Sequence, residues 1–167
     1  MNNLKNKKSK ETKPDYVTNL ESAYGAPSQN AFGSASFFEQ LKDSDKLEEA
    51  ALRKYKYFVG DIWERFGEDA WMSAWRQVYT RPAGAAYDVV AELKGITDPG
   101  ALLSVPMILD VVENAEAARQ ALIAAYDDSA VKELVVYNIG EGGAMSGLLI
   151  AGRRSNGETT YLVFLYD

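Results

Sequence analysis

Apolar residues recur every three or four positions in the middle of the chain, a spacing that places them on one face of an α-helix. Over residues 44–66 this face consists of Leu47, Ala51, Tyr55, Phe58, Ile62 and Phe66. Either Ser44 or Asp45 is a suitable cap, and Asp45 with Glu48 three positions later resembles a capping box. We expect Gly67 to end this helix.

Two further helices are predicted before residue 100. The first carries Trp71 and Trp75 one turn apart, and the same spacing continues to Val78. The second spans residues 80–95, with a proline near its first turn and a glycine just past its end. Proline and glycine usually occupy these positions at the two ends of a helix.

The apolar run VPMILDVV, residues 105–112, is ambiguous. Its β-branched residues favour a strand, but the run also fits the first two turns of the helix that follows. That helix, residues 113–128, is rich in alanine and has Asn114 as a suitable cap. Asp98 before Pro99 indicates a short helical turn ahead of the run. We favour the order strand, helix, strand.

Three β runs form the last third of the chain, at residues 131–140, 146–154 and 158–167. The dipeptide Asn156-Gly157 joins the last two and favours a two-residue hairpin loop, in which Ser155 lies opposite Glu158. This register pairs Ile150 with Val163, Leu148 with Leu165 and Leu149 with Phe164. The three pairs lie on both faces of the sheet, so we expect both faces to be covered. Helices can cover one face, and a second helical layer or another subunit must cover the other.

The first 43 residues show the weakest pattern, being rich in Asn, Ser, Lys and Gly with scattered aromatic residues. We expect residues 1–43 to form a flexible arm, disordered to about residue 20 and then lying either across the body of the protein or across a neighbouring subunit. Residues 44–167 would then form a single α+β domain, mainly helical over 44–104 and sheet-forming over 105–167. The predicted fold class is therefore α+β, with N-terminal helices, a strand-helix-strand unit and a C-terminal antiparallel β-meander.

The chain contains neither cysteine nor histidine, which removes disulfides, zinc–thiolate sites, thiol nucleophiles and Ser-His-Asp triads. An enzyme made from these residues would depend on carboxylates, Lys, Tyr, Ser or Arg alone. No catalytic, metal or cofactor motif is complete, so we predict no residue in any of these roles and favour a protein that is not an enzyme. The lack of cysteine also fits a reducing cytoplasm. No apolar run reaches the length of a membrane span.

Charge is distributed unevenly along the chain. Residues 1–13 hold five lysines and one glutamate, a net charge of +4, whereas the whole chain carries −6. The remaining residues therefore carry −10. This charge disfavours nucleic acid and anionic lipid as partners, and it favours a basic protein.

A glycine-rich stretch, YNIGEGGAMSG at residues 137–147, resembles a phosphate-binding loop only superficially. It lacks the Lys of a P-loop, Met145 occupies the position of the last glycine in G-x-G-x-x-G, and Glu141 would repel a phosphate. The stretch is better interpreted as a wide turn between two strands, in which Met145 can also contact a partner.

Eight aromatic residues lie between positions 55 and 79, and they either pack as core or form a Trp/Tyr groove for a partner protein. Glu64 and Glu68 lie one turn apart beside Trp63, as in a carboxylate pair for glycoside cleavage. The same spacing is typical of the solvent face of an amphipathic helix.

These observations predict a non-catalytic, cytoplasmic protein of bacterial type that binds another protein, as an adaptor, an immunity-like neutraliser or a chaperone-like module. It would use an acidic surface containing Trp and Tyr, and an apolar sheet face. The predicted contact residues are Trp71, Trp75, Met145, Arg153 and Arg154. A homo-oligomer is compatible with this hypothesis. Two alternatives stay open: a small-molecule-binding or sensory domain with a pocket between helices and sheet, and a carboxylate-based hydrolase.

Overall fold

A five-stranded antiparallel sheet lies at the centre of the computed structural model, which describes residues 12–166. The strands are β1 (Gly33–Gln40), β2 (Arg76–Thr80), β3 (Val131–Ile139), β4 (Ser146–Arg154) and β5 (Glu158–Tyr166). Their order across the sheet is β1-β5-β4-β3-β2, so the last three form a meander at its centre. The predicted α+β class and the C-terminal antiparallel meander are confirmed.

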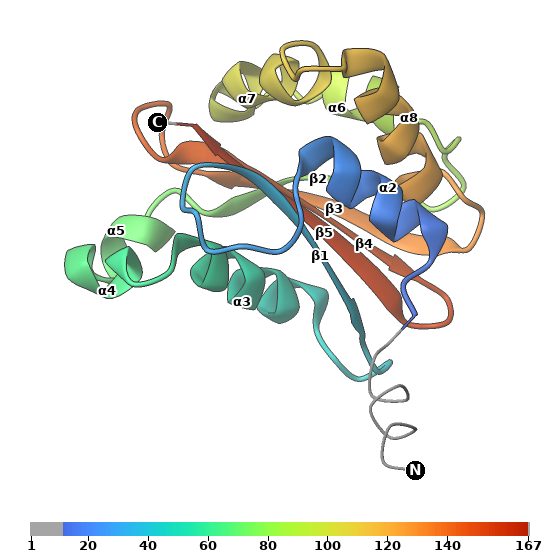
Figure 1. Ribbon diagram of the computed structural model, residues 1–167, viewed down its shortest axis with the longest axis horizontal. Helices are drawn as coiled ribbons and strands as arrows, with labels where there is room; N and C mark the ends of the chain where they lie inside the picture. The colour runs from blue at the N-terminus through green and yellow to red at the C-terminus, as the bar shows by residue number, and fades with distance from the viewer. Residues whose placement is uncertain (1–11, 167) are drawn as a thin grey trace.

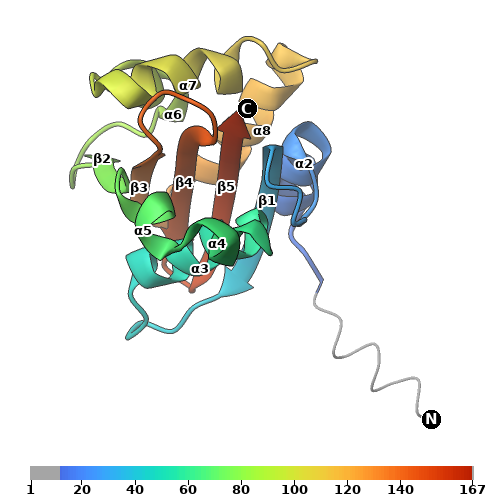
Figure 2. The same ribbon diagram turned by 90° about the vertical axis from the view of Figure 1, so that its left-hand side faces the viewer.

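Helices cover both faces of this sheet (Figure 1). One layer consists of α2 (Asp15–Tyr24), α6 (Val89–Lys94), α7 (Pro99–Leu109) and α8 (Ala115–Tyr126). The other layer consists of α3 (Leu47–Val59), α4 (Ile62–Phe66) and α5 (Glu68–Met72). The view in Figure 2, turned by 90°, shows the same two layers. The apolar residues on both sheet faces are thus covered by two helical layers of one chain.

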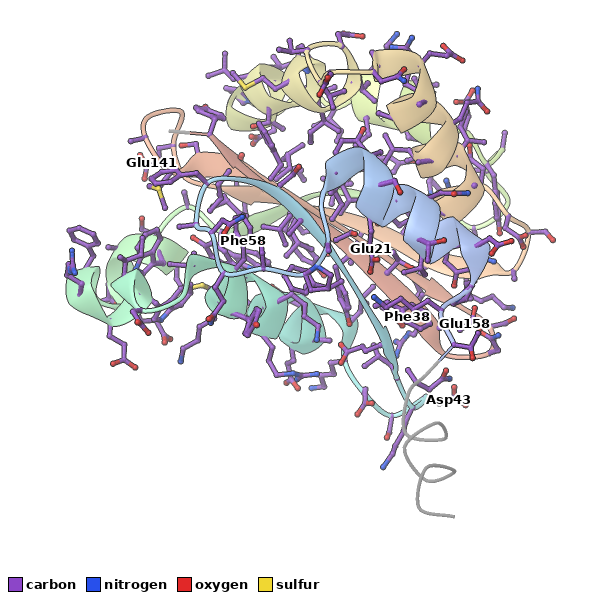
Figure 3. All side chains as sticks on the ribbon, in the orientation of Figure 1. Glu21, Phe38, Asp43, Phe58, Glu141 and Glu158 are labelled. Carbon is purple, nitrogen blue, oxygen red and sulfur yellow. The ribbon has the colours of Figure 1, made fainter. Side chains whose placement is uncertain are left out.

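Each layer encloses its own hydrophobic core, because neighbouring residues of a strand point to opposite faces. Leu148 and Ile150 of β4 pack under α2, α6, α7 and α8 in a core made mostly of Leu, Ile, Val and Ala, the aliphatic core. Leu149 and Ala151 pack against α3, α4 and α5 in a core that contains most of the buried rings, the aromatic core. Phe58 lies between α3 and the sheet in this second core (Figure 3).

The loop of the β4–β5 hairpin is one residue longer than predicted. It has three residues, 155–157, and the Gly157 N–H donates to the carbonyl oxygen of Arg154 at 2.9 Å. Gly157 is the residue of this loop with positive φ, at 92°, which is typical of a three-residue loop rather than a two-residue type I′ turn. The observed pairs are Leu148 with Phe164, Leu149 with Val163 and Ile150 with Leu162. The predicted register is therefore wrong by one residue.

Residues 12–43 are not a flexible arm in this structure. Helix α2 packs against α8, and β1 pairs with β5 along its whole length. The Ser34 hydroxyl donates to the carbonyl oxygen of Tyr24 at 2.6 Å and joins the strand to the end of the helix. The prediction for 1–43 is wrong over these elements, and the part of it at residues 1–11 lies outside the described residues.

In the ambiguous run, residues 105–109 form the end of helix α7 and residues 110–112 form a turn. The run is thus neither the predicted strand nor the start of the helix that follows, and the predicted strand-helix-strand unit lacks its first strand. Helix α7 begins at Pro99 and continues through Pro106. It begins there because the Asp98 carboxylate accepts hydrogen bonds from the N–H groups of Gly100 and Ala101.

Three other predicted helices are shorter than expected. Gly60, with φ of 75°, ends α3 and separates it from α4. Asp88 caps α6, so the predicted helix over 80–95 begins only at residue 89. Residues 76–80 form the edge strand β2 instead of the end of a helix, because pairing with β3 gives their backbone an alternative set of hydrogen bonds.

Candidate functional site

Trp71 and Met145, distant in sequence, line the same surface groove. The groove has a volume of about 340 Å³ and lies between α5 and the loop of residues 140–145, the glycine loop. We call it the aromatic groove, and it is lined by Tyr55, Phe66, Ala70, Trp71, Ser73, Gly140, Glu141, Ala144 and Met145. In Figure 2 the glycine loop lies at the end of the sheet between α7 and α5.

Two short helices fix the wall of the groove. Gly67, with φ of 85°, ends α4 and lets α5 fold back beside it. The Trp71 ring stacks on Trp63 with 5.8 Å between centroids, and its Nε1–H donates to the Trp63 carbonyl oxygen at 2.8 Å. Trp71 is 7% exposed, whereas Phe66 packs edge-on against it and is 61% exposed. The wall is therefore a buried tryptophan with an exposed phenylalanine beside it.

Trp75 lies behind the groove and does not line it. Its ring stacks between Tyr55, at 5.4 Å, and Tyr137, at 4.6 Å, and its Nε1–H donates to Glu48 at 2.9 Å. The Tyr55 hydroxyl donates to the Trp71 carbonyl oxygen at 2.8 Å, which links this stack to the groove wall. Burial raises the pKa of Tyr55 well above its usual value, so the hydroxyl stays protonated as a donor. Trp75 is thus a support for the groove.

The glycine loop is held in one conformation. Gly140, Gly142 and Met145 have φ of 76°, 100° and 62°, values that glycine adopts readily and methionine does not. The Gly142 N–H donates to the Ser146 hydroxyl at 2.9 Å, and the Met145 N–H donates to the carbonyl oxygen of Tyr166 at 2.9 Å. These bonds fix the left-handed backbone that presents Met145 to the groove.

Three carboxylates lie on the two elements that form the aromatic groove. Glu141 lies in the loop that forms one side (Figure 3), and Glu68 and Asp69 lie on α5 at the other. All three residues are exposed. Among residues 12–166 none of the three makes an ion pair. The groove therefore has an apolar centre and an acidic rim.

Arg153 and Arg154 lie at the other end of β4 and point into opposite helical layers. Arg153 donates to the carbonyl oxygen of Asp45 at 2.9 Å, ahead of α3. Arg154 lies 3.7 Å from the centroid of the Tyr16 ring and donates to the carbonyl oxygen of Ala125 at 3.1 Å. Their side chains are only 14% and 11% exposed. Both guanidinium groups are thus bound within the protein, which leaves little of them for a partner.

The predicted apolar contact face of the sheet is closed. Strands β3, β4 and β5 are buried along most of their length beneath the two helical layers. A partner can reach the aromatic groove but not a sheet face.

The predicted carboxylate pair does not lie on a single helix. Glu64 belongs to α4 and Glu68 to α5, and the glycine break at Gly67 separates them. Sequence reasoning missed a different acidic cluster, in which the Arg81 guanidinium binds Glu92 at 2.6 Å and Asp127 at 3.1 Å.

The Arg81 cluster is buried and joins β2 to α6 and the end of α8. Burial alone would raise the pKa of Glu92, but hydrogen bonds from Arg81 and Tyr79 outweigh burial and hold that pKa below its usual value. Burial raises the pKa of Asp127, although a backbone N–H and Arg81 oppose the shift. Because Arg81 is only 5% exposed and lies between both carboxylates, the cluster is a structural ion network.

Within the described residues, no three or more acidic side chains gather in a way that could hold a metal ion. None of the helices in that part of the chain has the length and apolar character needed to cross a membrane. The chain matches no protein-family model, no curated protein and no solved structure. Function is therefore inferred from the groove and its charges.

Proposed function

We propose that this protein is a non-catalytic protein-binding module that holds a basic partner protein in the aromatic groove. The observation that carries the proposal is the exposure of Phe66, at 61%, beside Trp71 and Met145 at the centre of an acidic rim. Aromatic residues and methionine are enriched at the centres of protein interfaces.

The rigidity of the groove supports this proposal. Trp71 is fixed by its ring stack and its hydrogen bond to Trp63, and Met145 is fixed by the backbone of the glycine loop. A wall that is ordered before binding loses little conformational entropy when a partner docks, so more of the contact energy contributes to affinity.

The rim favours basic residues on the partner. Glu141 lines the groove, Glu68 and Asp69 precede the lining residues Ala70 and Trp71 on α5, and residues 14–167 together carry −10. Rim charges mainly accelerate association and make it sensitive to salt, whereas the apolar centre sets the lifetime of the complex. We therefore expect an association rate that falls as ionic strength rises.

Native mass spectrometry of the protein purified from its own host tests the proposal. We expect a second polypeptide in stoichiometric amount, and we expect the variant Phe66→Ser to lose it while its melting temperature stays within a few degrees. Tyr57→Ser is the matched control, because Tyr57 is also half-exposed, at 50%, but lies on α3 outside the groove. A protein that carries no second polypeptide, or one retained equally by Phe66→Ser, would contradict the proposal.

A further inference from the structure

We propose that the outer side of α7 and the turn after it form a second docking surface, which takes an amphipathic helix with an apolar face flanked by Lys or Arg. This surface goes beyond the aromatic groove. It shares with the proposed function only the premise that the protein binds other proteins, and it is tested separately.

Helix α7 is apolar on both of its sides. Its inner side, which includes Ala101, Val105, Ile108 and Leu109, is buried in the aliphatic core. Its outer side and the following turn expose Leu102 at 51%, Leu103 at 52%, Met107 at 36% and Val111 at 73%. A surface helix normally carries polar residues on its outer side. The outer side of α7 therefore lacks the polar residues that are typical of the solvent-facing side of a helix.

These exposed residues form a continuous stripe. Leu103 and Met107 lie one turn apart on the same side of α7, and Val111, in the turn after the helix, lines the same hollow as Met107. Scattered apolar residues are ordinary on protein surfaces, whereas a contiguous apolar patch marks an interaction site. We call Leu102, Leu103, Met107 and Val111 the α7 stripe.

A hollow at one end of the stripe offers room for an anchoring side chain. It has a volume of about 340 Å³ and lies between α7, the end of α2 and the sheet. Met107 and Val111 form its outer wall, and Phe164 of β5 contributes to its lining. The Tyr24 hydroxyl donates to the Ile108 carbonyl oxygen at 2.9 Å and holds the end of α2 against α7. The hollow is thus a defined feature of the fold.

Charge around the stripe selects the partner. The acidic residues between Lys94 and Arg119 are Asp98, Asp110, Glu113 and Glu116. Asp98 is paired with Arg76, and Asp110 and Glu116 are paired with Arg119, so four carboxylates meet two guanidinium groups and a net negative charge is left there. Glu113 is exposed and makes no ion pair within the described residues. An apolar helix with flanking Lys or Arg side chains complements this arrangement.

The other occupants of such a stripe are disfavoured by the same charges. A second copy would bring another chain of net charge −6 toward this net negative region. A membrane with anionic head groups would be repelled for the same reason. A helix fits the shape, since the stripe runs along the outer side of α7 into the turn after it and apolar helix sides pack together with interlocking side chains.

The test uses a synthetic 18-residue peptide in which Leu residues form one helical face and Lys residues flank it. A matched peptide carries Glu in place of each Lys. We expect the Leu/Lys peptide to shift the backbone amide resonances of residues 102–105 and 107–112 and of Phe164 in the isotope-labelled full chain. We expect the Leu/Glu peptide to shift none of them.

Variants locate the binding site by affinity, measured by calorimetry. Leu102→Ser combined with Val111→Ser should lower the affinity for the Leu/Lys peptide by about tenfold or more, as loss of central apolar contacts does in other interfaces. Glu113→Gln should lower this affinity severalfold and reduce its dependence on salt concentration. The control Phe66→Ser should leave the affinity unchanged, because Phe66 belongs to the aromatic groove.

Several outcomes would overturn the proposal. Equal binding of both peptides, no binding of either, or resonance shifts confined to the aromatic groove would each do so. Sedimentation that finds a dimer of the unmodified chain, and a monomer of the Leu102→Ser/Val111→Ser variant, would assign the stripe to a second copy. Loss of the partner by Phe66→Ser would still support the proposed function in that case.

Discussion

The two helical layers cover the same sheet with different chemistry. In the aromatic core the short helices α4 and α5 are fixed by stacked rings whose N–H and O–H groups bond to backbone carbonyls, as Trp71 does to Trp63. In the aliphatic core α7 is packed mainly by Leu, Ile and Val side chains, and the hydrogen bonds to it come from Tyr24 and Arg119 near its C-terminal end. Directional contacts between rings therefore fix individual residues in the first layer, whereas the second depends more on total apolar area.

This difference explains the two kinds of surface that the layers present. The aromatic layer places one exposed ring, Phe66, beside a rigid wall, which gives a small groove with a defined shape. The aliphatic layer exposes a longer stripe on α7, which has little shape of its own apart from the hollow beside it. The first surface is suited to one side chain at a set position, and the second to the side of a helix.

The largest expected effect separates the wall of the groove from its exposed ring. Trp71→Ala removes a buried ring, its stack on Trp63 and a hydrogen bond, so we expect a loss of about 3–5 kcal/mol in the free energy of unfolding. Phe66→Ala should cost under ~1 kcal/mol because its ring is largely in water. Urea denaturation followed by circular dichroism measures both. Similar losses for the two variants would remove the distinction between wall and contact residue.

A second test concerns the ion network that accompanies the aliphatic core. Glu92→Gln leaves the buried Arg81 without its closest carboxylate, so we expect a loss of about 3 kcal/mol at neutral pH. If chemical denaturation gives a loss as small as that of an exposed ion pair, under ~1 kcal/mol, then the network does not hold β2 to α6.

The pH dependence of the same variant checks the cause. The pKa of Glu92 is lowered in the folded protein, so its ionised carboxylate stabilises the fold. This contribution to the free energy of unfolding is complete above the usual pKa of 4.5 and is lost as the pH falls through the folded-state pKa. The stability gap between the unmodified chain and Glu92→Gln should therefore shrink from pH 6 toward pH 3. Asp127 has a raised pKa and acts in the opposite direction, since its protonation favours the fold.

A smaller effect is expected in the glycine loop, where the two layers approach each other. Gly142→Ala places a side chain at φ of 100°, so we expect a loss of about 1–2 kcal/mol. Gly143→Ala should be nearly neutral, because φ there is not positive and a Cβ would meet no atom within 4 Å. Thermal unfolding compares the pair. Equal stability of the two variants would indicate that the backbone of Gly142 is not constrained.

The smallest effect on stability is expected at the α7 stripe. Leu102→Ser combined with Val111→Ser changes side chains that are 51% and 73% exposed, so the free energy of unfolding should change by no more than about 1 kcal/mol. Denaturant titration measures it. A larger loss would place these residues among those that hold α7 to the sheet, in contrast to the outer position described for them.

Patterns within one segment were predicted well, and arrangements that depend on distant segments were not. The β3–β4–β5 meander follows from three apolar runs and a glycine-containing turn. Strand β1 was missed because its apolar residues lie in a Ser- and Gly-rich segment and its pairing partner is β5, at the other end of the chain. The end of α7 at residues 105–109 could not be told from a strand, because a short apolar run has the same composition in a buried strand and a buried helix.

The candidate site was predicted only in part. Trp71 and Met145 were chosen for their residue types, but their meeting in one groove depends on the break at Gly67 and on the glycine loop. Phe66 was missed because it continues the apolar spacing of a predicted helix and was assigned to its buried side. Arg153 and Arg154 carry no sequence signal of their internal partners, since those partners are largely backbone carbonyl groups.

The strand order has a consequence for synthesis of the protein on the ribosome. Strand β5 lies between β4 and β1, so β1 has no neighbour in the sheet until residues 158–166 have been translated and have left the exit tunnel. Until then the apolar side chains of β1 and the inner side of α3 lack their final contacts. Nascent chains halted before residue 158 should consequently be sensitive to protease from β1 onward, and protection should appear only after β5 emerges.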